Sequence, residues 1–113
     1  MSGITTHVLD TAQGRPASGV PVVLDVRGEN GWRELGAGTT DADGRIRQLL
    51  PAGSALAEGV YRLTFGIETY FRAQGIEGFY PEASIVFHVR DAHQHHHVPL
   101  LLSPYGYSTY RGS

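Results

Sequence analysis

Short runs of alternating apolar and polar residues recur along the chain, and they limit its possible folds more than any other feature. The alternation is clearest over residues 20–26, 61–65 and 85–89. Residues two apart lie on the same face of a strand, so each run is expected to form a half-buried β-strand. About eight such strands at short, regular spacing are typical of sandwiches and barrels. We therefore predict an all-β fold, an antiparallel β-sandwich.

Turn signals separate these runs. Glu29-Asn30-Gly31 suits a hairpin turn because Asn and Gly tolerate positive φ, and Asp41-Ala42-Asp43-Gly44 is typical of a second tight turn. A loop over residues 51–59 and a bend over residues 103–106 are also expected. The one predicted helix is short and spans Glu68 to Gln74.

The composition narrows the class of protein. The 113 residues are expected to form a single domain, residues 1–113. Nine Lys+Arg against eleven Asp+Glu leave no basic surface, so neither nucleic acid nor membrane is an expected partner. The absence of cysteine excludes disulfides and thiolate chemistry. Neither a signal peptide nor an apolar run of roughly eighteen residues is visible, so a cytoplasmic location is expected.

Histidine is the enriched functional residue type, and four of the six histidines lie between Ala92 and Val98. Alternation from residue 95 to residue 102 directs Val98, Leu100 and Leu102 into the core. It directs four others to the opposite face: His95, His97, Pro99 and Leu101. A partly apolar outer face on a small sandwich commonly marks a subunit interface. We therefore predict a homo-oligomer with functional groups along that interface.

Three side chains are candidates for catalysis. His7 and His97 carry imidazoles that titrate near neutral pH, which suits a general base. Arg45 follows a turn, where its guanidinium could bind a planar carbonyl or carboxylate through two hydrogen bonds. Taken singly, a strand histidine is more often structural and an arginine after a turn is more often only solvated.

A metal site is an alternative use of the histidines, because neutral imidazoles bind zinc or copper. His93, His95 and His97 would lie on one side of an extended strand. Residues two apart on a strand are separated by roughly 6.6–7 Å, and no carboxylate or cysteine partner is obvious. We expect no metal or other cofactor, but the metal alternative stays open.

The final residues, Tyr110-Arg111-Gly112-Ser113, add a phenol, a guanidinium and a hydroxyl directly after a strand-like run. The first residues of a chain, like the last, tend to fray unless they are held. A polar cluster drawn from His7, His97 and this last segment is hard to explain as core packing. It points to an active site.

Four segments together resemble the transthyretin-related 5-hydroxyisourate hydrolases. They are Thr6-His7-Val8-Leu9-Asp10, Asp43-Gly44-Arg45, residues 95–102, and residues 103–113 ending in Tyr-Arg-Gly-Ser. The resemblance covers essentially the whole chain, and the last four residues are its most specific element. The related hormone carriers share the Leu-Ser-Pro-Tyr stretch but lack that ending.

The resemblance implies a transthyretin-like sandwich of about eight strands and one short helix. It implies hydrolysis of 5-hydroxyisourate to 2-oxo-4-hydroxy-4-carboxy-5-ureidoimidazoline in urate breakdown, without a cofactor. It further implies a homotetramer with sites at the dimer–dimer interface. The family's functional residues fall here on a set with catalytic and substrate-binding roles: His7, Arg45, His97, Tyr110, Arg111 and Ser113.

One position departs from the family, which commonly has His-Tyr-His where this chain has His95-His96-His97. Alternation directs His96 away from His97, so the change is not expected to abolish activity, and His95 is a secondary candidate. Two other functions are considered: a carrier of a small aromatic ligand on the same fold, and a histidine-rich metal-binding module.

Overall fold

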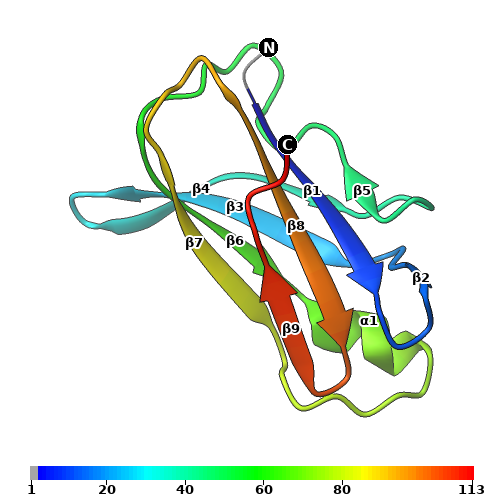
Figure 1. Cartoon of the computed structure of the whole chain (residues 1–113). Coiled ribbons are helices and arrows are strands. Elements are labelled where there is room, and N and C mark those ends of the chain that lie inside the picture. The colour runs from blue at the N-terminus through cyan, green and yellow to red at the C-terminus, as the bar shows by residue number, and fades with distance from the viewer. Residues whose placement is uncertain (1–2) are drawn as a thin grey trace.

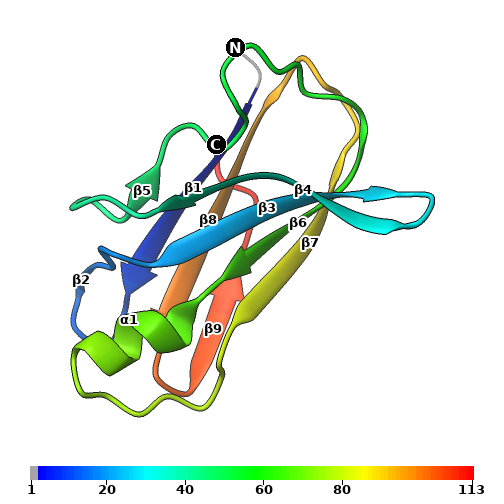
Figure 2. The same cartoon turned by 180° about the vertical axis from the view of Figure 1, so that it is seen from behind.

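Two β-sheets packed face to face make up the protein, with one short helix at one end (Figure 1). The computed structural model describes residues 3–113. The first sheet contains β1 (Gly3–Asp10), β2 (Arg15–Pro16), β5 (Arg45–Ile46), β8 (His95–Ser103) and β9 (Gly106–Thr109). The second contains β3 (Pro21–Gly28), β4 (Gly31–Thr39), β6 (Gly59–Phe65) and β7 (Ala83–Val89). The helix α1 spans Ile67–Ala73, and Figure 2 shows it near β2. The predicted sandwich is confirmed.

Strand order places β1, the first strand, beside β8 at the centre of one sheet. The first sheet has the order β2-β1-β8-β9, with β5 also paired to β1, and the second has the order β4-β3-β6-β7. β1 and β8 pair in parallel, whereas every other described strand pair is antiparallel. The prediction of antiparallel pairing therefore misses this one pair. The chain builds the whole second sheet between β1 and β8, so their relative direction is not set by a short turn.

Alternating side chains of both sheets form the core. On β8 the inward residues Val98, Leu100 and Leu102 are buried, as predicted. They face apolar residues of the second sheet such as Leu24, Leu63 and Phe65, none of which is exposed at all. Burying a side chain of this size contributes roughly 1.5–3 kcal/mol. This packing holds the outward-facing residues of β1 and β8 on a rigid support.

The predicted turns are confirmed, with small differences in detail. The β3–β4 hairpin pairs Gly28 with Gly31, so Glu29 and Asn30 form a two-residue loop. Positive φ falls on Gly31 (111°) rather than on Asn30, because glycine has no Cβ to clash. The predicted helix from 68 to 74 is shifted by one residue, to Ile67–Ala73.

Candidate active site

The outer face of the first sheet brings the predicted catalytic residues together. The register pairs His7 with Pro99 of β8 on one side and with Arg45 of β5 on the other. One row further, Thr5 pairs with His97, and His97 forms an isolated bridge to Gly112. Directly paired residues share a face. His7, Arg45 and His97 therefore lie on the same outer surface although they come from three distant segments.

Thr5, which no sequence pattern singles out, connects two of the histidines. The hydroxyl of Thr5 lies 2.8 Å from Nε2 of His95 and 2.8 Å from Nδ1 of His97. Both distances are typical of strong hydrogen bonds to a hydroxyl. The other ring nitrogen of His97, Nε2, makes no hydrogen bond to any of the described residues 3–113.

A tight turn carries Arg45 to this surface. Asp41 Oδ1 accepts hydrogen bonds from the backbone N–H groups of Asp43 and Arg45, each at 2.9 Å. The hydrogen bond from Arg45 is the main reason that the pKa of Asp41 lies below its ordinary value. Gly44 adopts φ 75° and packs against the carbonyl oxygen of Val8, where a Cβ would clash. The turn therefore fixes the position of Arg45 at the start of β5.

The last described residues fold back over His97. The backbone N–H of Gly112 donates to the carbonyl oxygen of His97 at 2.8 Å. A Cβ on Gly112 would lie 2.5 Å from His97 Cδ2 and 3.3 Å from Pro99 Cγ, so a side chain here would displace the imidazole. This contact explains why the third residue of the Tyr-Arg-Gly-Ser ending is a glycine. It also covers Pro99, which is buried although it lies on the outer face.

The environment of His97 favours its neutral form. Burial lowers the pKa of His97 most, and the positive charge of Arg45 and the neighbouring His7 and His95 lower it further. A neutral imidazole with a free nitrogen is the form that accepts a proton. The site therefore holds a base that remains available below the pH at which an ordinary histidine becomes charged.

A cavity of about 300 Å³ opens at this cluster. It is lined by Thr5, Thr6, Arg45, Ile46, Arg47, His95, His97 and Ser113. Three predicted site residues, Arg45, His97 and Ser113, therefore meet in one cavity. His7 lies beside it on β1, close enough to influence the charge of His97.

Two predicted substrate-binding residues lie elsewhere within the chain. Tyr110 and Arg111 line a mostly apolar cavity of about 320 Å³ between β7 and the last segment, with Ile85 and Phe87. Tyr110 is 57% exposed, and Arg111 donates hydrogen bonds to Gln94 Oε1 and the His95 carbonyl oxygen. The structure of one chain thus does not bring Tyr110 into the cavity lined by His95 and His97, which we call the histidine cavity.

His96 points to the inner face, as alternation predicts. It is 4% exposed, and its Nδ1 is buried without a hydrogen-bond partner among residues 3–113. Burial is the main reason that its pKa is lowered. His96 belongs to the apolar cavity beside Tyr110 and not to the surface that carries His97.

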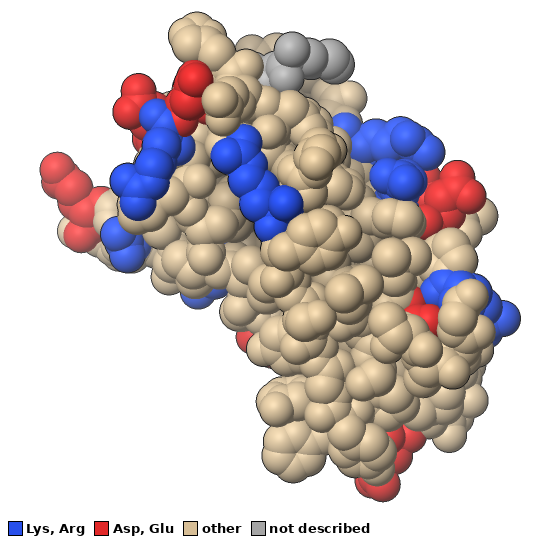
Figure 3. Space-filling model, in the orientation of Figure 1, with Lys and Arg blue, Asp and Glu red and all other residues tan. Residues whose placement is uncertain are grey.

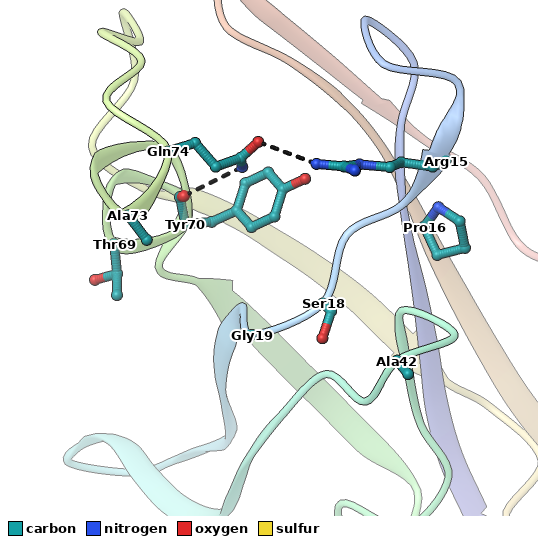
Figure 4. A pocket seen from close by; sticks show the side chains of 9 residues that line it. All are labelled: Arg15, Pro16, Ser18, Gly19, Ala42, Thr69, Tyr70, Ala73 and Gln74. Atoms are coloured by element: carbon teal, nitrogen blue, oxygen red, sulfur yellow. Dashed lines mark hydrogen bonds between the residues drawn. The ribbon is translucent and has the colours of Figure 1, made fainter.

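A larger cavity of about 440 Å³ lies at the opposite end of the sandwich, between α1 and the turn after β1 (Figure 4). Arg15, Ser18 and Tyr70 are among its lining residues. Gln74 there accepts a hydrogen bond from Arg15 and donates one to the Tyr70 carbonyl oxygen. None of the predicted site residues lines this cavity.

The face that carries the site is poor in charge. Figure 3 shows a broad uncharged area over β8 and β9, with charged side chains gathered mainly along the upper part and the edges. Leu101 lies on the outer face of β8, and Tyr105 and Tyr107, in the β8–β9 turn and on β9, are exposed. Exposed apolar surface of this kind is typical of protein–protein contacts.

Within residues 3–113, no group of three or more His, Cys, Asp or Glu side chains is arranged to hold a metal ion. The described part of the chain also contains no helix of the length and apolar character needed to cross a membrane.

Comparison with known proteins assigns the chain to a family. The HIUase/Transthyretin family model matches residues 4–112. The 5-hydroxyisourate hydrolase of Caulobacter vibrioides is 51% identical over 117 aligned positions, covering 100% of both chains. That of Mus musculus is 47% identical, covering 99% of this chain and 96% of its own. The chain belongs to the HIUase/Transthyretin family.

Solved structures of both branches of the family match the fold. Klebsiella pneumoniae 5-hydroxyisourate hydrolase superposes with a TM-score of 0.85 at 39% identity, covering 99% of this chain and 100% of its own. Sea bream transthyretin in complex with thyroxine superposes with a TM-score of 0.89 at 32% identity, covering 96% of this chain and 93% of its own. The fold alone therefore does not separate a 5-hydroxyisourate hydrolase from a transthyretin, and the side chains of the site must do so.

Proposed function

We propose that the protein hydrolyses 5-hydroxyisourate to 2-oxo-4-hydroxy-4-carboxy-5-ureidoimidazoline, a step of purine catabolism. The observation that carries the proposal is the convergence of His7, Arg45 and His97 on one outer face. Relatives that are about half identical along nearly the whole chain are named for this activity. The substrate is a small, planar, carbonyl-rich heterocycle, and a cavity of about 300 Å³ beside an arginine suits it.

In the proposed mechanism His97 accepts a proton from water through its free Nε2. The resulting hydroxide attacks a ring carbonyl carbon, so that a C–O bond forms and the carbonyl oxygen becomes negative. Arg45 stabilises that oxyanion by hydrogen bonds and charge. The ring C–N bond then breaks, and the leaving nitrogen takes a proton from an imidazole. His7, beside the cavity, is positioned to share in holding the water or supplying this proton.

We also propose that the active form is a homotetramer with sites at the dimer–dimer interface. The uncharged outer face and the exposed Tyr110 support this assembly. Within one chain Tyr110 lies away from the histidine cavity, so a role in substrate binding requires a second copy or a rearrangement. Arg111 and Ser113 would complete the site from the last segment. Sedimentation equilibrium tests the assembly, and a monomer with full activity would contradict it.

Three further expectations belong to this proposal. Residues 1–113 form one catalytic domain, the protein acts in the cytoplasm, and the reaction needs no metal or organic cofactor. Dialysis against a chelator tests the last of these and separates the hydrolase from a histidine-rich metal-binding module. Activity should survive the treatment, and restoration of a lost activity by zinc would support the alternative.

The direct test is an assay of 5-hydroxyisourate decay. Urate oxidase generates the compound from urate, and its ultraviolet absorbance is followed with and without the protein. The compound decays spontaneously, so acceleration over that rate is the readout. We expect strong acceleration that depends on the last four residues.

A carrier of a small aromatic ligand is the second candidate, because the superposition on sea bream transthyretin is as close as that on the hydrolase. A carrier has no use for a neutral histidine with a free nitrogen beside an arginine. Stoichiometric binding of thyroxine without acceleration of the decay would favour the carrier.

A further inference from the structure

The hydroxyl of Thr5 lies between two imidazoles, and this position restricts where protons can be. A threonine hydroxyl has one hydrogen to donate and lone pairs that accept. It is 2.8 Å from His95 Nε2 and 2.8 Å from His97 Nδ1. Among residues 3–113 these two rings are the only hydrogen-bond partners of the hydroxyl, so when both imidazoles are neutral Thr5 donates its hydrogen to one ring and accepts from the other. The tautomers of His95 and His97 are thereby coupled through one atom.

Two arrangements satisfy these contacts. In the first, Thr5 donates to His97 Nδ1, so the hydrogen of His97 is on Nε2. In the second, His97 Nδ1–H donates to Thr5, and Thr5 donates to His95 Nε2. Only the second leaves Nε2 of His97 without a hydrogen and able to accept a proton.

The surroundings of His97 favour the second arrangement. Its Nδ1 edge contacts Thr5 and its Cδ2 edge contacts Gly112, so Nε2 is the nitrogen left for the cavity. Arg45 and Arg47 also line that cavity, and guanidinium groups only donate hydrogen bonds. A lone pair on Nε2 facing these donors is more favourable than another N–H group.

His95 imposes no opposing preference. It is exposed, so water satisfies its Nδ1 in either tautomer. His97 is half-buried, and Thr5 is its one side-chain partner among the described residues 3–113. The arrangement also persists when His97 becomes protonated, because Nδ1–H still donates to Thr5 and Thr5 still donates to His95.

We propose that Thr5 and His95 form a hydrogen-bonded chain with His97 that keeps the hydrogen of His97 on Nδ1 and its Nε2 free toward the cavity. Thr5 and His95 are then positioning residues for the base. The catalytic consequence rests on the proposed function, whereas the tautomer of His97 is a property of the folded protein and is measured without substrate. Hydrogen bonds that orient a functional imidazole typically change activity by about 10- to 100-fold when removed.

Three substitutions test the hydrogen-bonded chain of His97, Thr5 and His95, and a fourth is the control. Thr5→Val removes the hydroxyl at nearly constant shape, and Thr5→Ser restores it. His95→Ala removes the acceptor, which frees Thr5 to donate to His97 Nδ1 and to move the hydrogen of His97 to Nε2. Thr64→Val is the matched control, because Thr64 is a half-buried threonine of β6 in the other sheet.

The experiment combines NMR of ¹⁵N-labelled histidine at a pH above the titration of His97 with the 5-hydroxyisourate decay assay. For the unmodified protein we expect His97 to show a protonated Nδ1 and an unprotonated Nε2. This pattern should persist in Thr5→Ser and Thr64→Val, weaken in Thr5→Val and reverse in His95→Ala. The value of kcat should fall about 10- to 100-fold in Thr5→Val and His95→Ala.

The opposite pattern in the unmodified protein, with the hydrogen of His97 on Nε2, would overturn the proposal. So would an unchanged tautomer in both Thr5→Val and His95→Ala. If Thr5→Val does not fold, the His95→Ala protein decides, because His95 is exposed and its loss removes no core contact. An unmodified protein without hydrolase activity but with the expected tautomer would reject the proposed function and retain the hydrogen-bonded chain.

Discussion

The two ends of β1 each carry a polar cluster, and they differ in whether the titratable side chain of the cluster has all its hydrogen-bond partners. At the helix end, Asp10 is 1% exposed and accepts four hydrogen bonds. They come from the backbone N–H groups of Ala12 and Gln13, the Gln13 side chain and the Tyr70 hydroxyl. A carboxylate with this many donors is satisfied, so the cluster is structural.

At the histidine end, one ring nitrogen of His97 is left without a hydrogen-bond partner among residues 3–113. Nδ1 of His97 is hydrogen-bonded to Thr5, whereas Nε2 has no partner among residues 3–113. The pKa of His97 is lowered mainly by burial. The cavity here is the smaller of the two, about 300 Å³ against about 440 Å³. An imidazole nitrogen without a partner among these residues, rather than the size of the cavity, therefore distinguishes the site.

Removing the base should have the largest effect on activity. We expect His97→Ala to lower kcat/KM by about 10²- to 10⁴-fold, because a positioned general base contributes about that much. His7→Ala should fall in the same range if His7 holds the water or supplies the proton. The free energy of unfolding should change by about 1 kcal/mol or less in either variant, as denaturant titration can check. Near-normal turnover in one variant would remove that histidine from the mechanism.

Substitutions at the helix end should lower the stability of the protein and leave its activity nearly unchanged. Asp10→Ala leaves one buried and three part-buried donors without an acceptor, so we expect a loss of about 3 kcal/mol in the free energy of unfolding. Tyr70→Phe removes one of the four bonds, and its loss should be about 1 kcal/mol. The folded fraction of both proteins should hydrolyse substrate at nearly the normal rate. A specific loss of turnover with unchanged stability would make the helix end part of the site.

The pH dependence should report the lowered pKa of His97. The activity should hold to a pH below the ordinary 6.5 of histidine and then fall about tenfold for each further pH unit, because the neutral form is the base. Arg45→Met removes a positive charge and should raise the pKa of His97, which an NMR titration measures directly. A pKa of His97 that is not below 6.5 in the unmodified protein would contradict this account.

The same lowered pKa has a consequence for stability. As the pH falls through 6.5, the unfolded chain binds a proton at this histidine before the folded protein does. The contribution of His97 to the free energy of unfolding should therefore decrease from that pH down to the folded pKa and change no further below it. His96, whose pKa is also lowered by burial, should add to this loss.

Replacing His96 should have the smallest effect on activity, and it should stabilise the fold. The buried Nδ1 of His96 lacks a partner among the described residues, and leaving a buried polar group unsatisfied costs about 1–3 kcal/mol. The adjoining apolar cavity leaves room for a slightly larger ring. We expect His96→Phe to gain about 1 kcal/mol in thermal or denaturant unfolding and to retain activity. A destabilised protein would show that Nδ1 has a partner in the assembled state.

Local pattern in the sequence predicts much of this arrangement. Alternation places His97 on the outer face and His96 on the inner face, and the turn after Asp41 places Arg45 at the start of a strand. The β-sandwich, its turns and the short helix follow from the same kind of local signal. The resemblance of the whole chain to a family then assigns roles to these side chains.

The contacts that depend on register could not be predicted in this way. Thr5 meets His95 and His97 across 90 and 92 residues because β1 and β8 pair in parallel, and no turn between them sets their alignment. The satisfied state of Asp10 likewise depends on Tyr70 of α1, 60 residues away. Such pairings follow from how the two sheets close, which short-range alternation does not encode.

The most direct test of the account replaces the same residue type at each end. Arg45 lines the histidine cavity and Arg15 lines the larger cavity beside α1, so Arg45→Ala and Arg15→Ala form a matched pair. Acceleration of 5-hydroxyisourate decay is measured for equal amounts of the folded variants and of the unmodified protein. The account predicts that Arg45→Ala loses about 10²-fold or more, as when a group that stabilises an oxyanion is removed, while Arg15→Ala keeps nearly full activity. Full activity in Arg45→Ala, or loss confined to Arg15→Ala, would contradict the assignment of the active site to the histidine end.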